Sequence, residues 1–153
     1  MRVAHAKGWK PLFLTVSFVG TDNLMQQAGS DAEGEVITQV VPPYYLTDLK
    51  TVALYRRALA KSMPNSRPNF VSLEGFVDAM VLVEGLKKVG KELTGEGLIH
   101  AIESIHDMDM GLGPQLRLDY SAKDHKGFDH VIPTVVRGGR AVPFTDWSMV
   151  APK

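Results

Sequence analysis

The sequence has no cysteine among its 153 residues, which excludes disulfide bonds, thiolate metal ligands and a cysteine nucleophile. It also has no apolar run of about 18 residues, the length that a helix needs to cross a membrane. We therefore expect neither a disulfide scaffold nor a membrane-spanning helix.

The sequence also lacks an excess of either charge, since 17 Lys and Arg residues balance 17 Asp and Glu residues. Without a basic excess no basic surface is required, so nucleic acid is not an expected partner. The composition, 44% hydrophobic and 22% charged, is that of an ordinary globular chain with its own core.

Common catalytic and nucleotide-binding patterns are missing as well. The serines stand in no nucleophile elbow of the G-x-S-x-G kind. There is no G-x-G-x-x-G sequence and no phosphate-binding loop. We expect no enzyme, no catalytic residue and no cofactor.

The N-terminal stretch "MRVAHAKGWKPLFLTVSFVG" does not have the form of a signal peptide. Its apolar run is interrupted by Thr15 and Ser17, and no small-residue cleavage site follows. We expect a strand there and no export signal within these residues.

The first part of the chain predicts a strand–helix–strand crossover. The expected elements are a helix over 2–7, a strand over 11–19, a short helix over 22–28 and a strand over 35–41. Thr21 or Asp22 is the expected cap of the short helix. A crossover of this kind indicates a parallel sheet.

The middle of the chain predicts three longer helices, over 47–62, 72–89 and 95–105, with Thr47, Ser72 and Thr94 as caps. The helix over 72–89 has an apolar stripe that Leu82, Val83 and Leu86 make unusually wide. A helix this apolar is normally covered on more than one side.

The end of the chain changes to the alternation typical of strands. "QLRLDY" predicts a half-buried strand, and "HVIPTVVRGGRAVPF" predicts a hairpin that turns at Gly138-Gly139. Pro133 favours an edge position or a bulge for its strand. The predicted fold class is α/β: parallel αβ units, three long helices and a C-terminal antiparallel hairpin.

Several stretches together resemble one known family. They are "GWKPLFLTVSFVG", "GEVITQVVPP", "SLEGFVDAMVLVEGLKKVGKELTGEGLIHAIESI", "KDHKGFDH" and "VVRGGRAVP". Their order and spacing resemble the C-terminal part of type I periplasmic solute-binding proteins, in the leucine/isoleucine/valine-binding branch that serves ABC transporters. The resemblance extends from Gly8 to about Val142.

The resemblance implies a fold of two lobes with a solute held between them, of which this chain is only a part. Residues 8–62 and 114–143 would belong to the second lobe, and the helices within 70–106 would cover the first. The sheet under helix 72–89 would then lie in sequence that this chain does not contain. We expect the partial fold to be completed by dimerisation or by exchange of elements between copies.

The resemblance implies the solute-binding component of an ABC uptake transporter, located in the periplasm. Its partners would be an amino acid or a related small acid or amide, and a permease. With one wall missing, we expect the fragment not to bind solute alone, because a small ligand must have most of its surface buried. The alternative is an oligomeric interaction module that has lost solute binding.

The resemblance implies four ligand-binding residues. Ser17 and Phe18 end the first strand, and Ser17 occupies the place where the family has an acid that holds an ammonium group. Glu74 and Phe76 begin helix 72–89. Purely structural roles are the alternatives: core packing for Ser17, Phe18 and Phe76, and, for Glu74, a first-turn acid that complements the helix dipole.

Two polar stretches raise the question of a metal site. "DHKGFDH", residues 124–130, offers two aspartates and two histidines, but they flank a glycine in an expected turn. "HDMDMG", residues 106–111, is expected to be a solvated loop. We predict no metal at either stretch, with a metal-dependent hydrolase as the third hypothesis.

Overall fold

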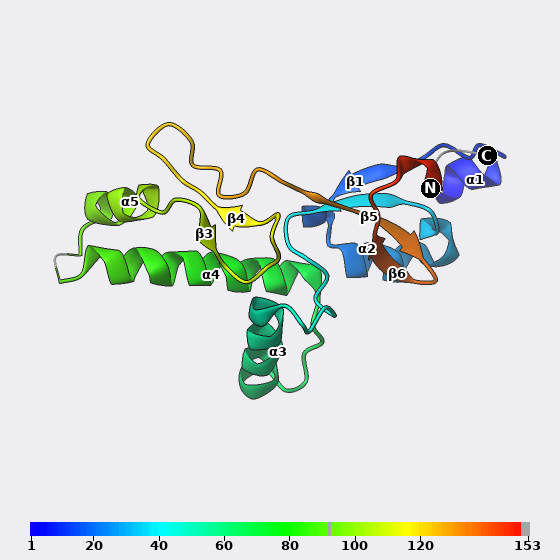
Figure 1. Ribbon diagram of the computed structural model, residues 1–153. Helices are drawn as coiled ribbons and strands as arrows, with labels where there is room; N and C mark the ends of the chain where they lie inside the picture. The colour runs from blue at the N-terminus through cyan, green and yellow to red at the C-terminus, as the bar shows by residue number, and fades with distance from the viewer. Residues whose placement is uncertain (92, 151–153) are drawn as a thin grey trace. The chain divides into compact units, whose positions relative to one another are not determined.

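The computed structural model describes residues 1–91 and 93–150 (Figure 1). They form two compact units, each of which is described by itself. The first unit holds residues 1–43, 69–71 and the chain from 131 onward. The second unit holds residues 44–68 and 72–130.

The first unit is built on a four-stranded sheet with the strand order β1-β2-β5-β6. Its strands are β1 (Leu14–Val16), β2 (Val36–Gln39), β5 (Ile132–Arg137) and β6 (Arg140–Pro143). β1 and β2 are parallel and are joined through α2 (Thr21–Ala28), which confirms the predicted crossover. β5 and β6 are antiparallel and turn at Gly138 and Gly139, both with positive φ, as predicted.

β2 lies between two strands and has its side chains packed on both faces of the sheet. Successive strand residues point to opposite faces. Val36 therefore packs against Val135 and Phe144, and Ile37 packs against Ala32 and Val136. Neither Val36 nor Ile37 is exposed, so both faces of β2 carry core.

The structure corrects three predicted details in the first unit. β1 is shorter than the expected strand over 11–19, because Ser17–Val19 form a 3-10 helix that Gly20 ends with a φ of 79°. Gly20 is also the N-cap of α2, so neither Thr21 nor Asp22 caps it. Pro133 lies in β5, an internal strand and not an edge strand, one residue before the pairing with β6 begins at Thr134.

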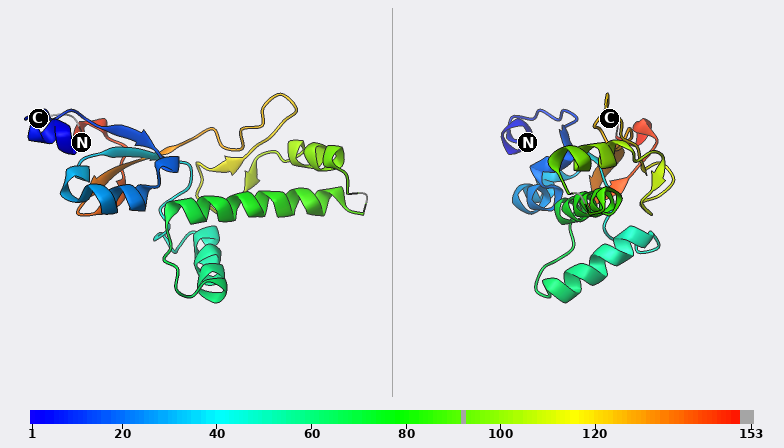
Figure 2. Two further views of the ribbon diagram at one scale, coloured as in Figure 1. Left: turned by 180° about the vertical axis from the view of Figure 1, so that it is seen from behind. Right: turned by 90° about the vertical axis from the view of Figure 1, so that its left-hand side faces the viewer.

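The second unit consists of helices and a small two-stranded ladder. Its elements are α3 (Lys50–Ser62), α4 (Phe70–Val89, in this unit from residue 72), α5 (Gly95–Glu103), β3 (Met108–Asp109) and β4 (Arg117–Leu118). α5 lies along α4 in the views of Figures 1 and 2. In the described residues, no helix combines the length and the hydropathy that crossing a membrane requires.

Within the second unit, the described residues cover one side of α4 and leave the other open. Leu73, Val77 and Val81 are buried, whereas Leu82 and Val83 are 46% and 47% exposed. Gly85 lets α5 approach closely, because a Cβ atom there would lie 2.8 Å from Ile102 Cγ1. The wide apolar stripe of the sequence therefore corresponds to one packed side and one open side.

Two of the three predicted helix caps are wrong. α3 begins at Lys50 after Leu49, which has no capping side chain, so Thr47 is not the cap. α4 begins at Phe70, so Ser72 lies inside the helix, where its Oγ is 2.5 Å from the hydroxyl of Tyr55. Thr94 does cap α5, because its Oγ1 accepts a hydrogen bond from the Gly97 amide at 3.0 Å.

Replacing Thr94 with alanine is expected to lower the free energy of unfolding of the second unit by about 1 kcal/mol, the usual contribution of a capping hydroxyl. Thr47→Ala is the matched control, and it should change stability by less than about 0.5 kcal/mol. Urea denaturation followed by circular dichroism measures both values. Equal losses in the two variants would contradict the cap assignment.

The segment 106–111, expected to be a solvated loop, is partly buried. It contains β3, and Met110 is only 6% exposed. The amide of Thr51 donates to the Gly111 carbonyl at 3.2 Å, which attaches the segment to α3. The prediction failed because two methionines separated by an aspartate give no clear period.

Candidate functional site

Ser17 and Phe18 lie in the first unit, in the 3-10 helix that follows β1. Ser17 is 6% exposed, whereas Phe18 is 85% exposed. Of this predicted pair, Phe18 has an exposed side chain and Ser17 a buried one, and the ligand-binding role of both stays a prediction. The alternative of a core role for Phe18 is excluded by its exposure.

A buried polar network lies at the same end of the sheet, and sequence reasoning missed it. Gln39 ends β2, and its Nε2 donates to Thr21 Oγ1 at 2.9 Å and to Thr134 Oγ1 at 3.4 Å. Thr134 Oγ1 in turn donates to the carbonyl of Ile37 at 2.7 Å. Open α/β sheets bind ligands beyond the carboxyl ends of their parallel strands, which is where this network stands.

One atom of the network is left unsatisfied. Gln39 Oε1 is buried and has no hydrogen-bond partner in the described part of the chain. A buried amide oxygen without a partner is unfavourable, so it favours a ligand or a neighbouring chain that donates to it. A glutamine within the apolar run "EVITQVV" was the available sequence signal.

Glu74 and Phe76 lie on α4, in the second unit. Because a helix turns by about 100° per residue, these two residues, two positions apart, lie on different faces of α4. Burial, followed by the nearby Asp78 carboxylate, raises the pKa of Glu74. α4 has no acid in its first turn, so the alternative role of Glu74 as a first-turn acid is wrong.

Phe76 borders a shallow apolar hollow between α3 and α4. Its ring centroid is 5.7 Å from that of Tyr55, and the hollow, of about 370 Å³, also includes Leu59 and Met63. Phe76 is thus half-buried against α3. The four predicted contacts are divided between the two units, and their joint role in ligand binding stays a prediction.

The stretch "DHKGFDH" begins at Asp124, which pairs with Ser121 across a turn at residues 122–123, and Gly127 lies at a bend rather than in the expected turn. Asp124 Oδ1 accepts from the Lys126 amide at 2.9 Å, and Lys126 Nζ is 2.8 Å from Asp129 Oδ1. His125 Nε2 lies 2.9 Å from Glu103 Oε1. Hydrogen bonds with His125 and then His100 lower the pKa of Glu103.

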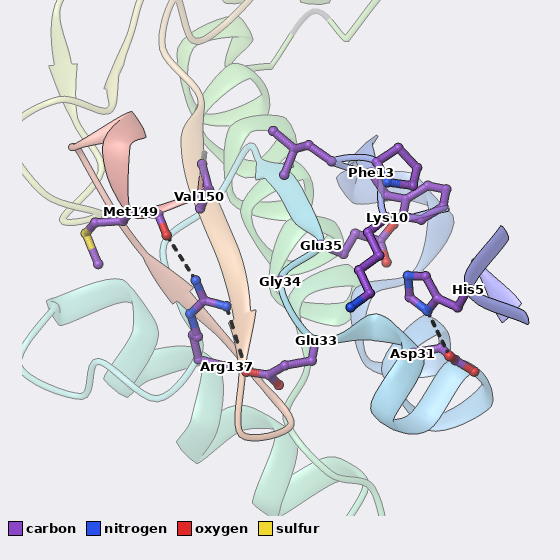
Figure 3. A pocket seen from close by; sticks show the side chains of 12 residues that line it. His5, Lys10, Phe13, Asp31, Glu33, Gly34, Glu35, Arg137, Met149 and Val150 are labelled. Carbon is purple, nitrogen blue, oxygen red and sulfur yellow. Dashed lines mark hydrogen bonds and ion pairs between the residues drawn. The ribbon is translucent and has the colours of Figure 1, made fainter. Parts of the chain in front are cut away.

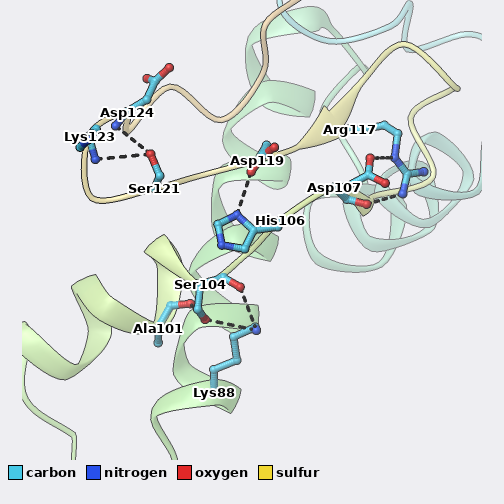
Figure 4. A network of polar contacts seen from close by, with 10 residues as sticks. All are labelled: Lys88, Ala101, Ser104, His106, Asp107, Arg117, Asp119, Ser121, Lys123 and Asp124. Carbon is cyan, nitrogen blue, oxygen red and sulfur yellow. Dashed lines mark hydrogen bonds and ion pairs between the residues drawn. The ribbon is translucent and has the colours of Figure 1, made fainter.

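The polar contacts near this stretch likewise join side chains within the second unit (Figure 4). His106 Nδ1 is 3.0 Å from Asp119 Oδ1, and Arg117 pairs with Asp107 across the β3–β4 ladder. Within residues 1–91 and 93–150, no group of three or more histidine or acidic side chains is disposed to hold a metal ion.

Residues 1–140 match a family described as periplasmic binding protein. A possible leucine/isoleucine/valine-binding protein from Rhodopirellula baltica is similar in structure, with a TM-score of 0.89 and 32% identity over 99% of this chain and 40% of that one. No curated protein matches.

Two further solved structures share the fold. A branched chain amino acid ABC transporter protein from Thermus thermophilus, with bound valine, has a TM-score of 0.79 and 23% identity over 94% of this chain and 41% of that one. A fatty acid ABC transporter substrate-binding protein from Thermomonospora curvata has a TM-score of 0.75 and 26% identity over 93% of this chain and 38% of that one. The chain thus spans about two fifths of the length of the proteins it resembles.

Proposed function

Because this chain belongs to the periplasmic binding protein family, we propose that it is the C-terminal portion of an ABC transporter substrate-binding protein of the branched-chain amino acid type. Its work is non-covalent: it contributes one part of a cleft that closes on a solute and presents the solute to a permease. The periplasm is the proposed location.

The observation that carries this proposal is the open edge of β1. β1 is parallel to β2 and has no other strand beside it in the described residues. Leu14 and Val16 on β1 are 57% and 43% exposed. Leu14 and Val16 point to the same face, and parallel strands are normally covered on both faces, so this exposed face and the unpaired edge both fit a sheet that continues in the part of the relatives outside the matched two fifths.

We propose that the isolated chain binds solute weakly or not at all. A small-molecule site buries most of the ligand surface. Among the predicted contacts, Phe18 is 85% exposed in the first unit, and this chain alone covers about 40% of the structural relative from Rhodopirellula baltica. The remaining wall would come from the part that the relative has in addition.

The proposed solute is an amino acid or a related small acid or amide. Valine is bound to the Thermus thermophilus relative, whereas the Thermomonospora curvata relative is titled for fatty acids. This chain has Ser17 rather than an acid after β1, and Gln39 is the last residue of the neighbouring strand β2. Because Gln39 Nε2 already donates to Thr21 and Thr134, the atom left for a ligand is the acceptor Oε1, which suits the ammonium group of an amino acid or the N–H group of an amide.

A chimeric protein tests the proposed function. The C-terminal two fifths of the Rhodopirellula baltica protein would be replaced by this chain, and binding of branched-chain amino acids, small acids and amides would be measured by calorimetry. We expect a folded monomer that binds one class of solute with micromolar affinity, while the isolated chain gives no saturable heat. A folded chimera that binds none of the panel contradicts the transport role, and micromolar binding by the isolated chain contradicts the fragment role.

The chimera also tests Phe18. Phe18→Ala should weaken solute binding by about tenfold, since burying an aromatic side chain contributes roughly 1.5–3 kcal/mol. The same change in the isolated chain should alter stability by less than about 0.5 kcal/mol, because Phe18 is 85% exposed. Val19→Ala is the control, and equal affinity losses for the two variants would contradict a contact at Phe18.

The open side of α4 favours a second candidate function, an oligomeric interaction module. Leu82, Val83 and Leu86 are 46%, 47% and 38% exposed, and they form one apolar strip that a second copy of this chain would cover. Light scattering after size exclusion should show a dimer for the isolated chain and a monomer for the double variant Leu82→Lys, Leu86→Lys. A native chain that stays monomeric at high concentration contradicts this candidate.

A further inference from the structure

The first unit contains a hollow of about 710 Å³ at the amino ends of its parallel strands (Figure 3). Phe13, which precedes β1, and Glu35, which precedes β2, both line it, together with Arg137 at the end of β5. This is the opposite end of the sheet from Ser17 and Gln39. The hollow is therefore separate from the proposed cleft, and its size suits a small molecule.

Two of the acids that line the hollow already have partners in the chain. Asp31 Oδ1 lies 2.9 Å from His5 Nδ1, and Glu33 Oε1 lies 3.9 Å from Arg137 Nη1. Figure 3 draws the His5–Asp31 contact within the lining. Asp31 and Glu33 therefore each have a partner among the residues that line the hollow.

Glu35 is the exception among these acids. It is 5% exposed, and its Oε2 has no hydrogen-bond partner in the part of the chain that the structure describes. Burial raises the pKa of this carboxyl group. An unpartnered buried carboxylate is costly, and a cationic group beside it removes that cost.

Lys10 is the complementary exception. Its side chain lines the same hollow, and the structure shows no ion pair between Lys10 and any described residue. Within the described residues, the lining therefore has one buried carboxylate oxygen without a hydrogen-bond partner, Glu35 Oε2, and one exposed ammonium group without an ion pair, that of Lys10. Leu12 and Phe13 add apolar surface to the same lining.

We propose that this hollow binds a small zwitterion, whose ammonium group pairs with Glu35 and whose carboxylate pairs with Lys10. The carbon chain between the two charges packs against Leu12 and Phe13. A molecule without an ammonium group leaves the buried Glu35 unpaired, so the site discriminates most strongly against it, whereas a molecule without a carboxylate loses only a pair with the exposed Lys10. The inference does not rest on the proposed transport function, because the isolated chain contains every residue of the hollow.

Matched probes test the site in the unchanged chain. The zwitterions γ-aminobutyrate and ε-aminocaproate would be compared with hexylamine and hexanoate, with amide-resolved NMR at neutral pH as the readout. We expect saturable chemical-shift changes of the Gly34 and Glu35 amides with at least one zwitterion. Hexanoate, which leaves Glu35 unpaired, should bind at least about tenfold more weakly, and hexylamine about two- to fivefold more weakly. Absence of saturation with both zwitterions, or equal binding of hexylamine or hexanoate, overturns the proposal.

Variants then assign the two charges. Glu35→Gln should weaken binding of the better zwitterion by about tenfold, and Lys10→Gln, at an exposed position, by about two- to fivefold. Lys7→Gln, at a position outside the lining, should leave binding unchanged. Circular dichroism checks that each variant is folded. If a variant does not fold, the comparison of the four compounds in the unchanged chain decides the proposal. If Lys10→Gln raises the Glu35 pKa without ligand and leaves zwitterion binding unchanged, Lys10 and Glu35 pair with each other and the proposal is wrong.

Discussion

Replacing Ile37 with alanine is expected to lower the free energy of unfolding of the first unit by about 2–5 kcal/mol, because the deletion leaves a cavity in a packed core. Ile37 is not exposed, and its strand is paired with β1 on one side and with β5 on the other. Its side chain packs with Ala32 and Val136, and Leu24 and Met25 of α2 pack against the same cluster. Because β2 is hydrogen-bonded to a strand on each side, the surrounding residues can move little to fill the cavity.

Urea denaturation with residue-specific probes in the first unit measures this loss. Since a small domain has only about 5–15 kcal/mol of stability, the alanine variant should be largely unfolded at modest urea concentrations. Ile37→Val should cost about 0.5–1.5 kcal/mol. Val131→Ala, at a position 55% exposed, is the surface control, and an Ile37→Ala loss no larger than the Val131→Ala loss would contradict the assignment of β2 as the core strand.

The sequence predicted β2 and the crossover from β1 to β2 correctly, because the pattern of apolar residues reflects which positions are buried. The run from Val36 to Val41 is β-branched and ends at two prolines, which leaves a strand as the natural assignment. The order strand, helix, strand then required a parallel pair, and β1–α2–β2 is that pair. Local period and connection length were sufficient here.

Helix starts could not be placed with the same accuracy. Threonine and serine favour capping positions, but the chain contains more of them than it has caps. At Thr47 the chain first makes a turn, in which the Leu49 amide donates to the Leu46 carbonyl, and α3 then begins at Lys50. Only at Thr94, with Gly95 and Gly97 beside it, did the local pattern determine the cap.

The candidate site shows the limit of a single sequence more clearly. Phe18 could be proposed from its place after β1, and the structure does expose it. The partners of Gln39 could not, because Thr21 and Thr134 are 18 and 95 residues away along the chain. A polar residue in an apolar run predicts that hydrogen bonds exist, but only the packed strands show which groups make them.

The second unit gives a similar lesson on α4. The sequence predicts an apolar stripe wide enough for two surfaces, but the helical period does not say which half this chain covers. α5 decides it by packing at Gly85, so Leu82, Val83 and Leu86 stay open. The division of residues 8–62, 114–143 and 70–106 between two lobes stays a prediction, because this chain covers only about 40% of the structural relative.

Replacing Gly127 with alanine is expected to lower the free energy of unfolding of the second unit by about 1–3 kcal/mol, as overpacking of a close contact does. A Cβ atom at Gly127 would lie 2.6 Å from Tyr120 Oη and 2.9 Å from Leu118 Cδ1. Leu118 is buried, and the Gly127 carbonyl accepts from the Asp119 amide at 3.0 Å, so the two segments cannot simply separate. The glycine of "DHKGFDH" is thus required for close approach.

Gly75→Ala is the matched control for Gly127→Ala, and it should act in the opposite direction. Gly75 lies inside α4, and a Cβ atom there would meet nothing within 4 Å. Alanine should therefore stabilise α4 by about 0.5–1 kcal/mol. Combining Gly127→Ala with Tyr120→Ala removes the ring that causes the clash, so the double variant should lose less stability than the sum of the single losses. Simple additivity in this cycle, measured by urea denaturation, would show that the tyrosine ring does not impose glycine at position 127.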